Sequence, residues 1–149
     1  MTAIDWFSRY LFAIPIRDKF ARTVAKALNR MIFARWGLCR EILTDQGTEF
    51  CNRLLGELCS QYGIKKLRTS GYRPMCTGRI ERTHCGLNMM IAKTINSNHD
   101  NWDELLDVIV AKANGTVNRS TGFTPNKLMT GREALTTTDL LLGSTVAKR

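Results

Sequence analysis

The chain has 149 residues, of which 44% are hydrophobic, and this length and composition fit one globular domain with its own core. No run reaches the ~18 apolar residues that a membrane-spanning helix needs, and no signal segment stands at the start, so we expect an intracellular chain without a membrane partner. The formal net charge of +9 indicates an anionic partner, for which nucleic acid is the usual choice and a merely basic surface the alternative.

Strand-like and helix-like segments alternate along the first half of the chain. Residues 10–16 are apolar and aromatic and predict a strand, and residues 20–36 carry apolar side chains at helical spacing up to Gly37, which ends that helix. Residues 40–45 predict the next strand. Asn52 then caps a helix whose apolar side consists of Leu54, Leu55, Leu58 and Tyr62.

The second half begins with a strand over residues 64–70 and then becomes mainly helical. Residues 71–79 hold two glycines and a proline and predict a loop. Helices are expected over residues 80–96 and 102–118, and a short last helix begins at Pro125. This order of elements predicts an α/β domain in which helices cover a sheet.

Two acids stand where metal-dependent chemistry could occur. Asp45 lies at the C-terminal end of a predicted strand, Glu81 lies in the first turn of a predicted helix, and 35 residues separate them. Carboxylate oxygens bind Mg²⁺, and two such ions ~3.5–4 Å apart can drive phosphodiester chemistry. The alternatives are that Glu81 only stabilises a helix start and that Asp45 only shapes the turn before Gly47.

The context of these acids resembles a known family. "TDQGTEF" at 44–50 and "GYRPMCTGRIERTH" at 71–84 are similar to motifs in the catalytic core of retroviral and gypsy-type retrotransposon integrases. "IDWFSRYLFAIP" resembles the second-strand segment of that family, and "WDELL" and "STGFTPNKLMTGRE" resemble its downstream helices. The resemblance covers about residues 3–133.

The resemblance implies an RNase H-like fold, a mixed sheet flanked by helices, with the first strand missing from this chain. Residues 1–133 would form a partial catalytic core and residues 134–149 a loose tail. In the family three acids hold two Mg²⁺ or Mn²⁺ ions, water attacks near the element end, and the freed 3′ hydroxyl attacks target DNA. Asp45 would be the second acid and Glu81 the third, and both would be metal ligands.

Several residues near these acids are expected to contact DNA. Tyr72, Arg73 and Pro74 lie on the predicted loop, where a ring beside a cation can stack on a base while the cation neutralises phosphate. The other expected DNA-binding residues are Lys65, Lys66, Arg79 and Arg82. The alternative is a solvated turn in which Tyr72 packs back on the domain.

Asp5 is a tempting substitute for the first acid. In the family that acid typically precedes the second by more than fifty residues, whereas Asp5 precedes Asp45 by forty. The segment around Asp5 instead matches the end of the second strand, where an aspartate favours a turn. We therefore expect Asp5 to be a turn residue and the first catalytic acid to be absent from the chain.

The resulting hypothesis is a DNA-integration protein with impaired 3′ processing and strand transfer. Its partners would be element ends and target DNA, together with further copies or intact integrase, and the family implies a nuclear location. The alternative is a catalytically dead DNA-binding or dimerisation remnant of a transposon.

Overall fold

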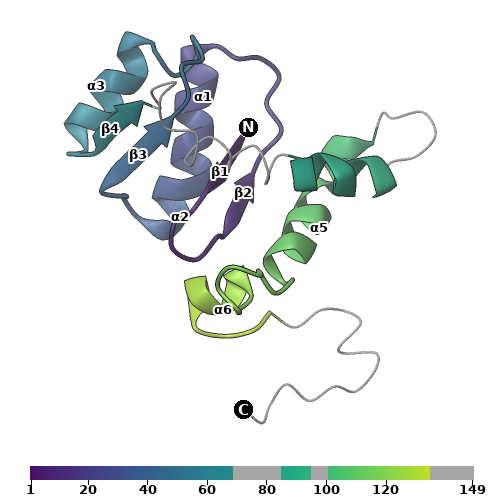
Figure 1. Ribbon diagram of the computed structural model, residues 1–149. Helices are drawn as coiled ribbons and strands as arrows, with labels where there is room; N and C mark the ends of the chain where they lie inside the picture. The colour runs from purple at the N-terminus through teal and green to yellow at the C-terminus, as the bar shows by residue number, and fades with distance from the viewer. Residues whose placement is uncertain (69–84, 95–100, 135–149) are drawn as a thin grey trace, which may run out of the picture.

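The structure is a computed structural model that describes residues 1–68, 85–94 and 101–134 (Figure 1). Its elements, in chain order, are β1 (Thr2–Ile4), β2 (Leu11–Ala13), α1 (Ala21–Leu28), the π-helical turn η1 (Asn29–Phe33), α2 (Ala34–Trp36), β3 (Glu41–Thr44), α3 (Arg53–Gln61), β4 (Lys65–Arg68), α5 (Trp102–Asn114) and α6 (Pro125–Thr130). Residues 85–94 are also helical. None of the helices in these ranges is long and apolar enough to span a membrane.

The described strands pair in two separate sheets. β1 and β2 form an antiparallel pair in which Ala3 lies opposite Phe12. β3 and β4 form a parallel pair in which Thr44 lies opposite Arg68, and α3 connects them, as a parallel connection requires. Because β3 and β4 run in the same direction, their C-terminal ends meet at one edge of this sheet.

Two clusters of buried side chains hold the helices on these sheets. One joins α1, η1 and α3 to the residue before β4 and consists of Val24, Leu28, Phe33, Leu55, Cys59 and Ile64. The other joins β2, the 85–94 helix and α5 and consists of Leu11, Leu87, Leu106 and Ile109. Figure 1 shows the same division, with α1 and α3 beside β3 and β4, and α5 next to β2.

The predicted helix over residues 20–36 is present, but its pitch changes on the way. Its start is organised by Asp18, whose carboxylate accepts a hydrogen bond from the backbone N–H of Phe20 at 2.9 Å. Hydrogen bonds from Thr23 and from that N–H lower the pKa of Asp18. After α1 the hydrogen bonding widens into η1, and Gly37 ends the helix with φ of 86°, as predicted.

The caps of α3 and α6 are also confirmed. Asn52 accepts a hydrogen bond from the Leu55 N–H at 2.8 Å, and Thr124 accepts one from the Lys127 N–H at 3.1 Å ahead of Pro125. A side-chain oxygen at this position satisfies one of the free N–H groups of the first helical turn. The local sequence therefore sets where both helices begin.

Two helix predictions need correction. The residues of α3 that are fully buried are Leu55 and Cys59, whereas Leu54 and Tyr62, expected on the apolar side, are 42% and 38% exposed. The predicted helix over residues 102–118 ends at Asn114. Gly115 follows as the C-cap residue and ends the helix earlier than predicted, since glycine is unfavourable inside a helix.

Asn114 fastens α5 to β2. Its side chain is 1% exposed, its Nδ2 donates to the Leu11 carbonyl at 2.9 Å, and its Oδ1 accepts from the Leu11 N–H at 2.8 Å. The amide thus meets the two backbone groups that a neighbouring strand would otherwise satisfy. This pair of bonds connects segments 103 residues apart.

Candidate metal and nucleic-acid site

Asp45 lies at the carboxyl edge of the parallel sheet, as predicted. It follows the last residue of β3 directly and is exposed. The Gly47 N–H donates to Asp45 Oδ1 at 3.1 Å, which fixes one carboxylate oxygen against the turn.

Glu49 lies next to Asp45, although the sequence reasoning gave it no role. A β-carbon added to Gly47 would lie 2.8 Å from Glu49 Oε2 and 3.1 Å from Asp45 Oδ1. The two carboxylates therefore converge over the bare α-carbon of Gly47. The signal in the sequence was a glycine with an acid two residues to either side, since only glycine leaves that space open.

These oxygens have the chemistry that a hard divalent cation prefers. Within residues 1–68, 85–94 and 101–134, however, no group of three or more His, Cys, Asp or Glu side chains is placed to hold a metal ion. The described part of the site thus offers two neighbouring carboxylates, which fit Mg²⁺ in kind but form an incomplete ligand set.

Thr44 is the buried residue closest in sequence to Asp45. Its side chain is 7% exposed, and its Oγ1 finds no hydrogen-bond partner among the described residues. A buried hydroxyl without a partner costs about 1–3 kcal/mol. Among the described residues, this hydroxyl at the end of β3 is the buried side-chain polar atom that lacks a hydrogen-bond partner.

Asp5 has the turn role that the sequence predicted. Its Oδ2 accepts hydrogen bonds from the backbone N–H and from the hydroxyl of Ser8, both at 2.7 Å. Its backbone N–H donates to the Tyr10 carbonyl at 2.9 Å, which closes the β1–β2 hairpin. The carboxylate is therefore engaged in local structure.

The two predicted DNA-binding lysines have different surroundings. Lys65 forms an exposed ion pair with Glu41, with 3.0 Å between Nζ and Oε1. Lys66 instead donates from Nζ to the Phe50 carbonyl, which lies in the loop between Asp45 and α3. Lys66 thus brings its charge toward the candidate site, whereas the charge of Lys65 is paired with the carboxylate of Glu41.

The remaining predicted site residues lie outside the described ranges. These are Tyr72, Arg73, Pro74, Arg79, Glu81 and Arg82. The same holds for the predicted loop over residues 71–79, for the start of the helix predicted from residue 80, and for the predicted tail beyond Ala134. The pairing of Asp45 with Glu81 therefore stays a prediction.

Solved structures define the fold class. The HTLV-2 integrase catalytic core domain in complex with magnesium, in its trimeric form, matches with a TM-score of 0.65 at 19% identity, over 85% of this chain and 80% of that one. The simian T-cell lymphotropic virus intasome, in complex with PP2A regulatory subunit B56 gamma, matches with a TM-score of 0.74 at 20% identity, over 91% of this chain and 49% of that one. The mixed α/β structure therefore matches the RNase H-like fold of integrase catalytic cores, which confirms the predicted fold class, whereas one continuous mixed sheet with its first strand missing stays a prediction.

Sequence comparison identifies the family. Residues 1–74 match the integrase core domain family. The chain is also 33% identical over 132 residues to the retrovirus-related Pol polyprotein from transposon 412 of Drosophila melanogaster. That alignment covers 89% of this chain but 11% of the polyprotein, so the chain spans about a tenth of this relative. The chain belongs to the integrase core domain family and is related to retrotransposon and retroviral Pol integrases.

Proposed function

We propose that this chain supplies part of the metal-dependent catalytic core of a DNA integrase, with Asp45 and Glu81 as two of its acidic ligands. The observation that carries the proposal is the position of Asp45, exposed at the carboxyl edge of a parallel strand pair in a chain of the integrase core family. Open α/β sheets place ligands at this edge. The related core in complex with magnesium supports the choice of Mg²⁺, with Mn²⁺ as its substitute.

The residues around Asp45 suit phosphodiester chemistry. The Gly47 N–H holds Oδ1, and Glu49 adds a second carboxylate on the same side. A divalent ion held here stabilises the negative charge that develops on a reacting phosphate. Cationic residues nearby neutralise the phosphates that flank it. In the proposed 3′ processing and strand transfer, water and then a freed 3′ hydroxyl are the attacking groups, and this site orients the phosphate.

We infer that catalysis by this chain alone is impaired. The β1–β2 and β3–β4 pairs share no ladder in the described structure, and the Thr44 hydroxyl at the end of β3 is buried without a partner there. Both observations support a sheet that needs one more strand, and the resemblance puts the first catalytic acid on that strand. Asp5 is occupied by Ser8, which favours the alternative of a DNA-binding or dimerisation role without catalysis.

The proposed partners are element ends, target DNA and further integrase copies in the nucleus. Two of the matched structures are described as a trimeric form and as an intasome, which supports an assembly of several chains. Contributions from other copies would also explain how an incomplete ligand set could serve catalysis.

A plasmid-nicking assay tests this function without knowledge of the element ends. Supercoiled DNA is incubated with the chain in Mg²⁺ or Mn²⁺, and we expect weak nicking that Asp45→Asn and Glu81→Gln abolish. Asp5→Asn keeps an acceptor for Ser8 and serves as the matched control, with activity unchanged. Nicking that survives Asp45→Asn would refute the role of this site, and strong nicking by the unaltered chain would refute its impairment.

A further inference from the structure

We propose that a groove between α3 and β4 binds the sugar–phosphate backbone of the DNA strand that leads to Asp45. This proposal rests on the proposed function and adds a backbone-binding surface to it. The groove has a volume of about 570 Å³, and its lining includes Arg53 and Glu57 from α3 and Lys66 and Arg68 from β4.

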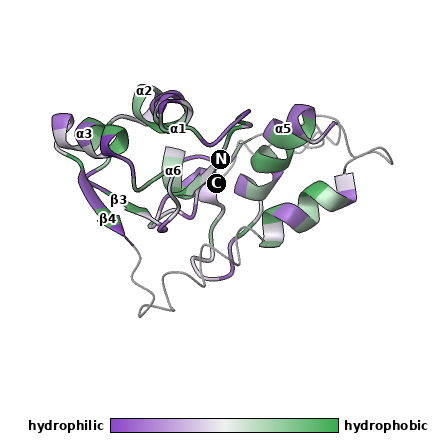
Figure 2. Cartoon of the chain, turned by 90° about the horizontal axis from the view of Figure 1, so that it is seen from above, coloured by the Kyte–Doolittle hydropathy of each residue, from purple (hydrophilic) through white to green (hydrophobic). Residues whose placement is uncertain are grey.

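The charges in this groove favour a polyanion. Among the described residues that line the groove, three are cations, Arg53, Lys66 and Arg68, and one, Glu57, carries a carboxylate. Lys66 and Arg68 are two residues apart in β4 and therefore point to the same side of the strand. Figure 2 shows β4 as a hydrophilic strand. Two cations on one side of a strand can each neutralise a phosphate of a nucleic-acid backbone.

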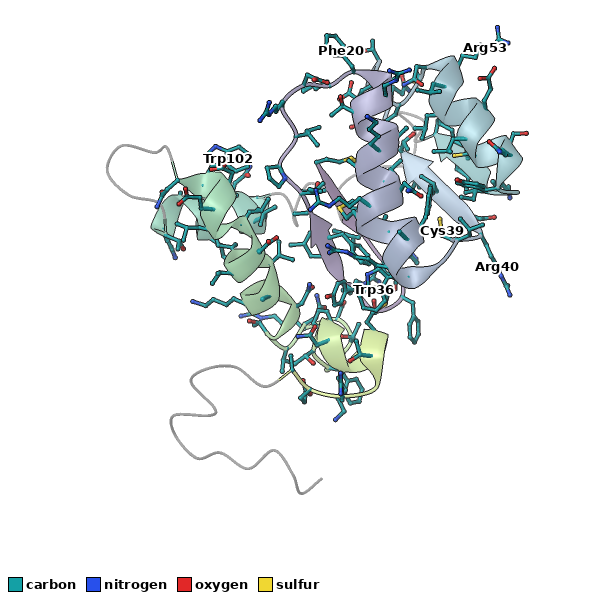
Figure 3. All side chains as sticks on the ribbon, turned by 180° about the vertical axis from the view of Figure 1, so that it is seen from behind. Phe20, Trp36, Cys39, Arg40, Arg53 and Trp102 are labelled. Atoms are coloured by element: carbon teal, nitrogen blue, oxygen red, sulfur yellow. The ribbon has the colours of Figure 1, made fainter. Side chains whose placement is uncertain are left out.

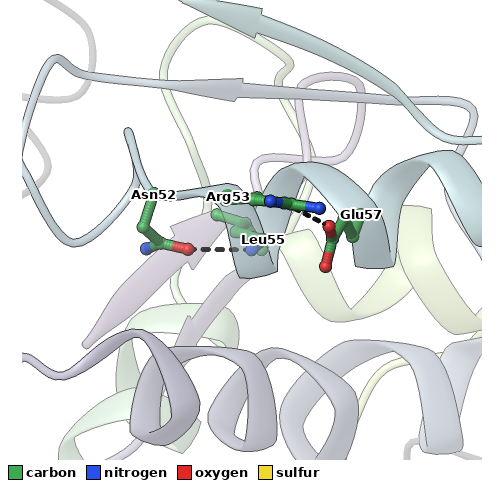
Figure 4. A network of polar contacts seen from close by, with 4 residues as sticks. All are labelled: Asn52, Arg53, Leu55 and Glu57. Atoms are coloured by element: carbon green, nitrogen blue, oxygen red, sulfur yellow. Dashed lines mark hydrogen bonds and ion pairs between the residues drawn. The ribbon is translucent and has the colours of Figure 1, made fainter.

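Arg53 has donors left for a phosphate. Its Nε donates to Glu57 Oε1 at 2.6 Å along the exposed side of α3 (Figure 4), and its side chain is 90% exposed. A guanidinium carries five N–H donors, so this pair leaves the terminal nitrogens available. Arg68 is exposed and makes no ion pair with any residue in the described ranges.

The position of the groove connects it to the candidate site. Arg68 lies opposite Thr44 in the parallel register, and Asp45 is the next residue after Thr44. Lys66 is bonded to the Phe50 carbonyl, in the loop that runs from Asp45 to α3. The groove therefore begins at the carboxyl edge that carries Asp45. A strand whose reacting phosphate lies at Asp45 can extend into it, and for this reason we assign DNA and not an acidic protein as the occupant.

Salt-dependent DNA binding tests this assignment. Binding of the full chain to a fluorescent 20-base-pair duplex and to the matching single strand is measured by anisotropy between about 50 and 200 mM salt. We expect Arg53→Ala and Arg68→Ala each to weaken binding several-fold. The slope of log affinity against log salt should fall in magnitude by ~0.9 on a duplex, or by ~0.7 on a single strand, per lost phosphate contact. Comparison of the affinities for the two probes shows which form of DNA the groove prefers.

Arg40→Ala is the matched control. Arg40 is exposed and precedes β3, at the end opposite to Asp45, and Figure 3 shows it far from Arg53. Its loss should leave binding and slope close to those of the unaltered chain. Arg68→Lys keeps the positive charge, so the slope of log affinity against log salt should return to that of the unaltered chain. This result would show that Arg68→Ala acts through a lost phosphate contact and not through misfolding. Glu57→Gln removes the opposing carboxylate and should tighten binding.

Three results would refute the proposal that this groove binds DNA. Equal losses from Arg40→Ala, Arg53→Ala and Arg68→Ala would mean general electrostatic attraction, and the proposed function would remain. Polyglutamate that binds as tightly as DNA, with the same sensitivity to Arg53 and Arg68, would assign the groove to an acidic protein. No DNA binding by the unaltered chain, even at the lowest salt, would refute both the groove and the proposed function.

Discussion

Replacing Asn114 tests whether one side chain holds α5 on the hairpin. In Asn114→Ala the Leu11 N–H and carbonyl lose their partners, at 2.8 and 2.9 Å, and Leu11 is itself only 4% exposed. Each buried backbone group left without a partner costs about 1–3 kcal/mol. We therefore expect a loss of about 2–6 kcal/mol for the two groups together, which is a large share of the ~5–15 kcal/mol that typically stabilises a domain.

Urea denaturation followed by circular dichroism measures this loss. The midpoint should fall while the slope against urea stays constant, because the same surface is exposed on unfolding. Lys112→Ala, on an exposed position two residues earlier in α5, is the control and should stay within ~0.5 kcal/mol. A loss below ~1 kcal/mol in Asn114→Ala would refute the reasoning, since it would mean that water or another group satisfies Leu11.

Two further substitutions probe the neighbourhood of Asp45. Thr44→Val removes the unpartnered hydroxyl while keeping the branched shape, so the free energy of unfolding should rise by about 1 kcal/mol; a thermal melt that shows a loss would reveal a partner for that hydroxyl. Asn52→Ala removes the cap of α3 and should cost about 0.5–2 kcal/mol in a urea melt, whereas Asn52→Asp keeps the acceptor for Leu55 and should retain most of the stability. If both Asn52 variants lose the same amount, the cap is not the cause.

The sequence predicted features that depend on a few neighbouring residues. The caps at Asn52 and Thr124 and the end at Gly37 arise from hydrogen bonds or backbone angles within a single turn, so a local pattern suffices. The turn at Asp5 is predictable for the same reason, because Ser8 is three residues away. These features are correct without any knowledge of tertiary structure.

Features that depend on distant partners were missed. The exposure of Leu54 follows from which side of α3 packs on α1, and the bond between Asn114 and Leu11 joins segments 103 residues apart. Helical periodicity predicts neither of these contacts, because it describes one element at a time.

The candidate site divides in the same way. The place of Asp45 at a strand end was predictable from a short apolar run followed by a turn. The convergence of Glu49 on Asp45 was not, because it depends on the conformation of the loop around Gly47. The difference between Lys65 and Lys66 was also hidden, since the parallel register decides that Lys65 meets Glu41.

The π-helical turn has a consequence for how this helix is compared with those of relatives. In an ordinary α-helix Met31 and Phe33 would be about 200° apart, yet both are buried, at 4% and 7% exposure. Phe33 meets the Tyr62 ring with 5.8 Å between centroids, and a turn later Trp36 meets Tyr10 at 5.3 Å. The extra residue in this turn changes the angular position of every residue that follows it. The residues of α1 and those of α2 are therefore described by two different helical wheels. A sequence alignment that places a gap at the wrong residue of this segment would therefore assign buried residues on one side of the turn to exposed positions. This error would occur even where the aligned residue types are similar.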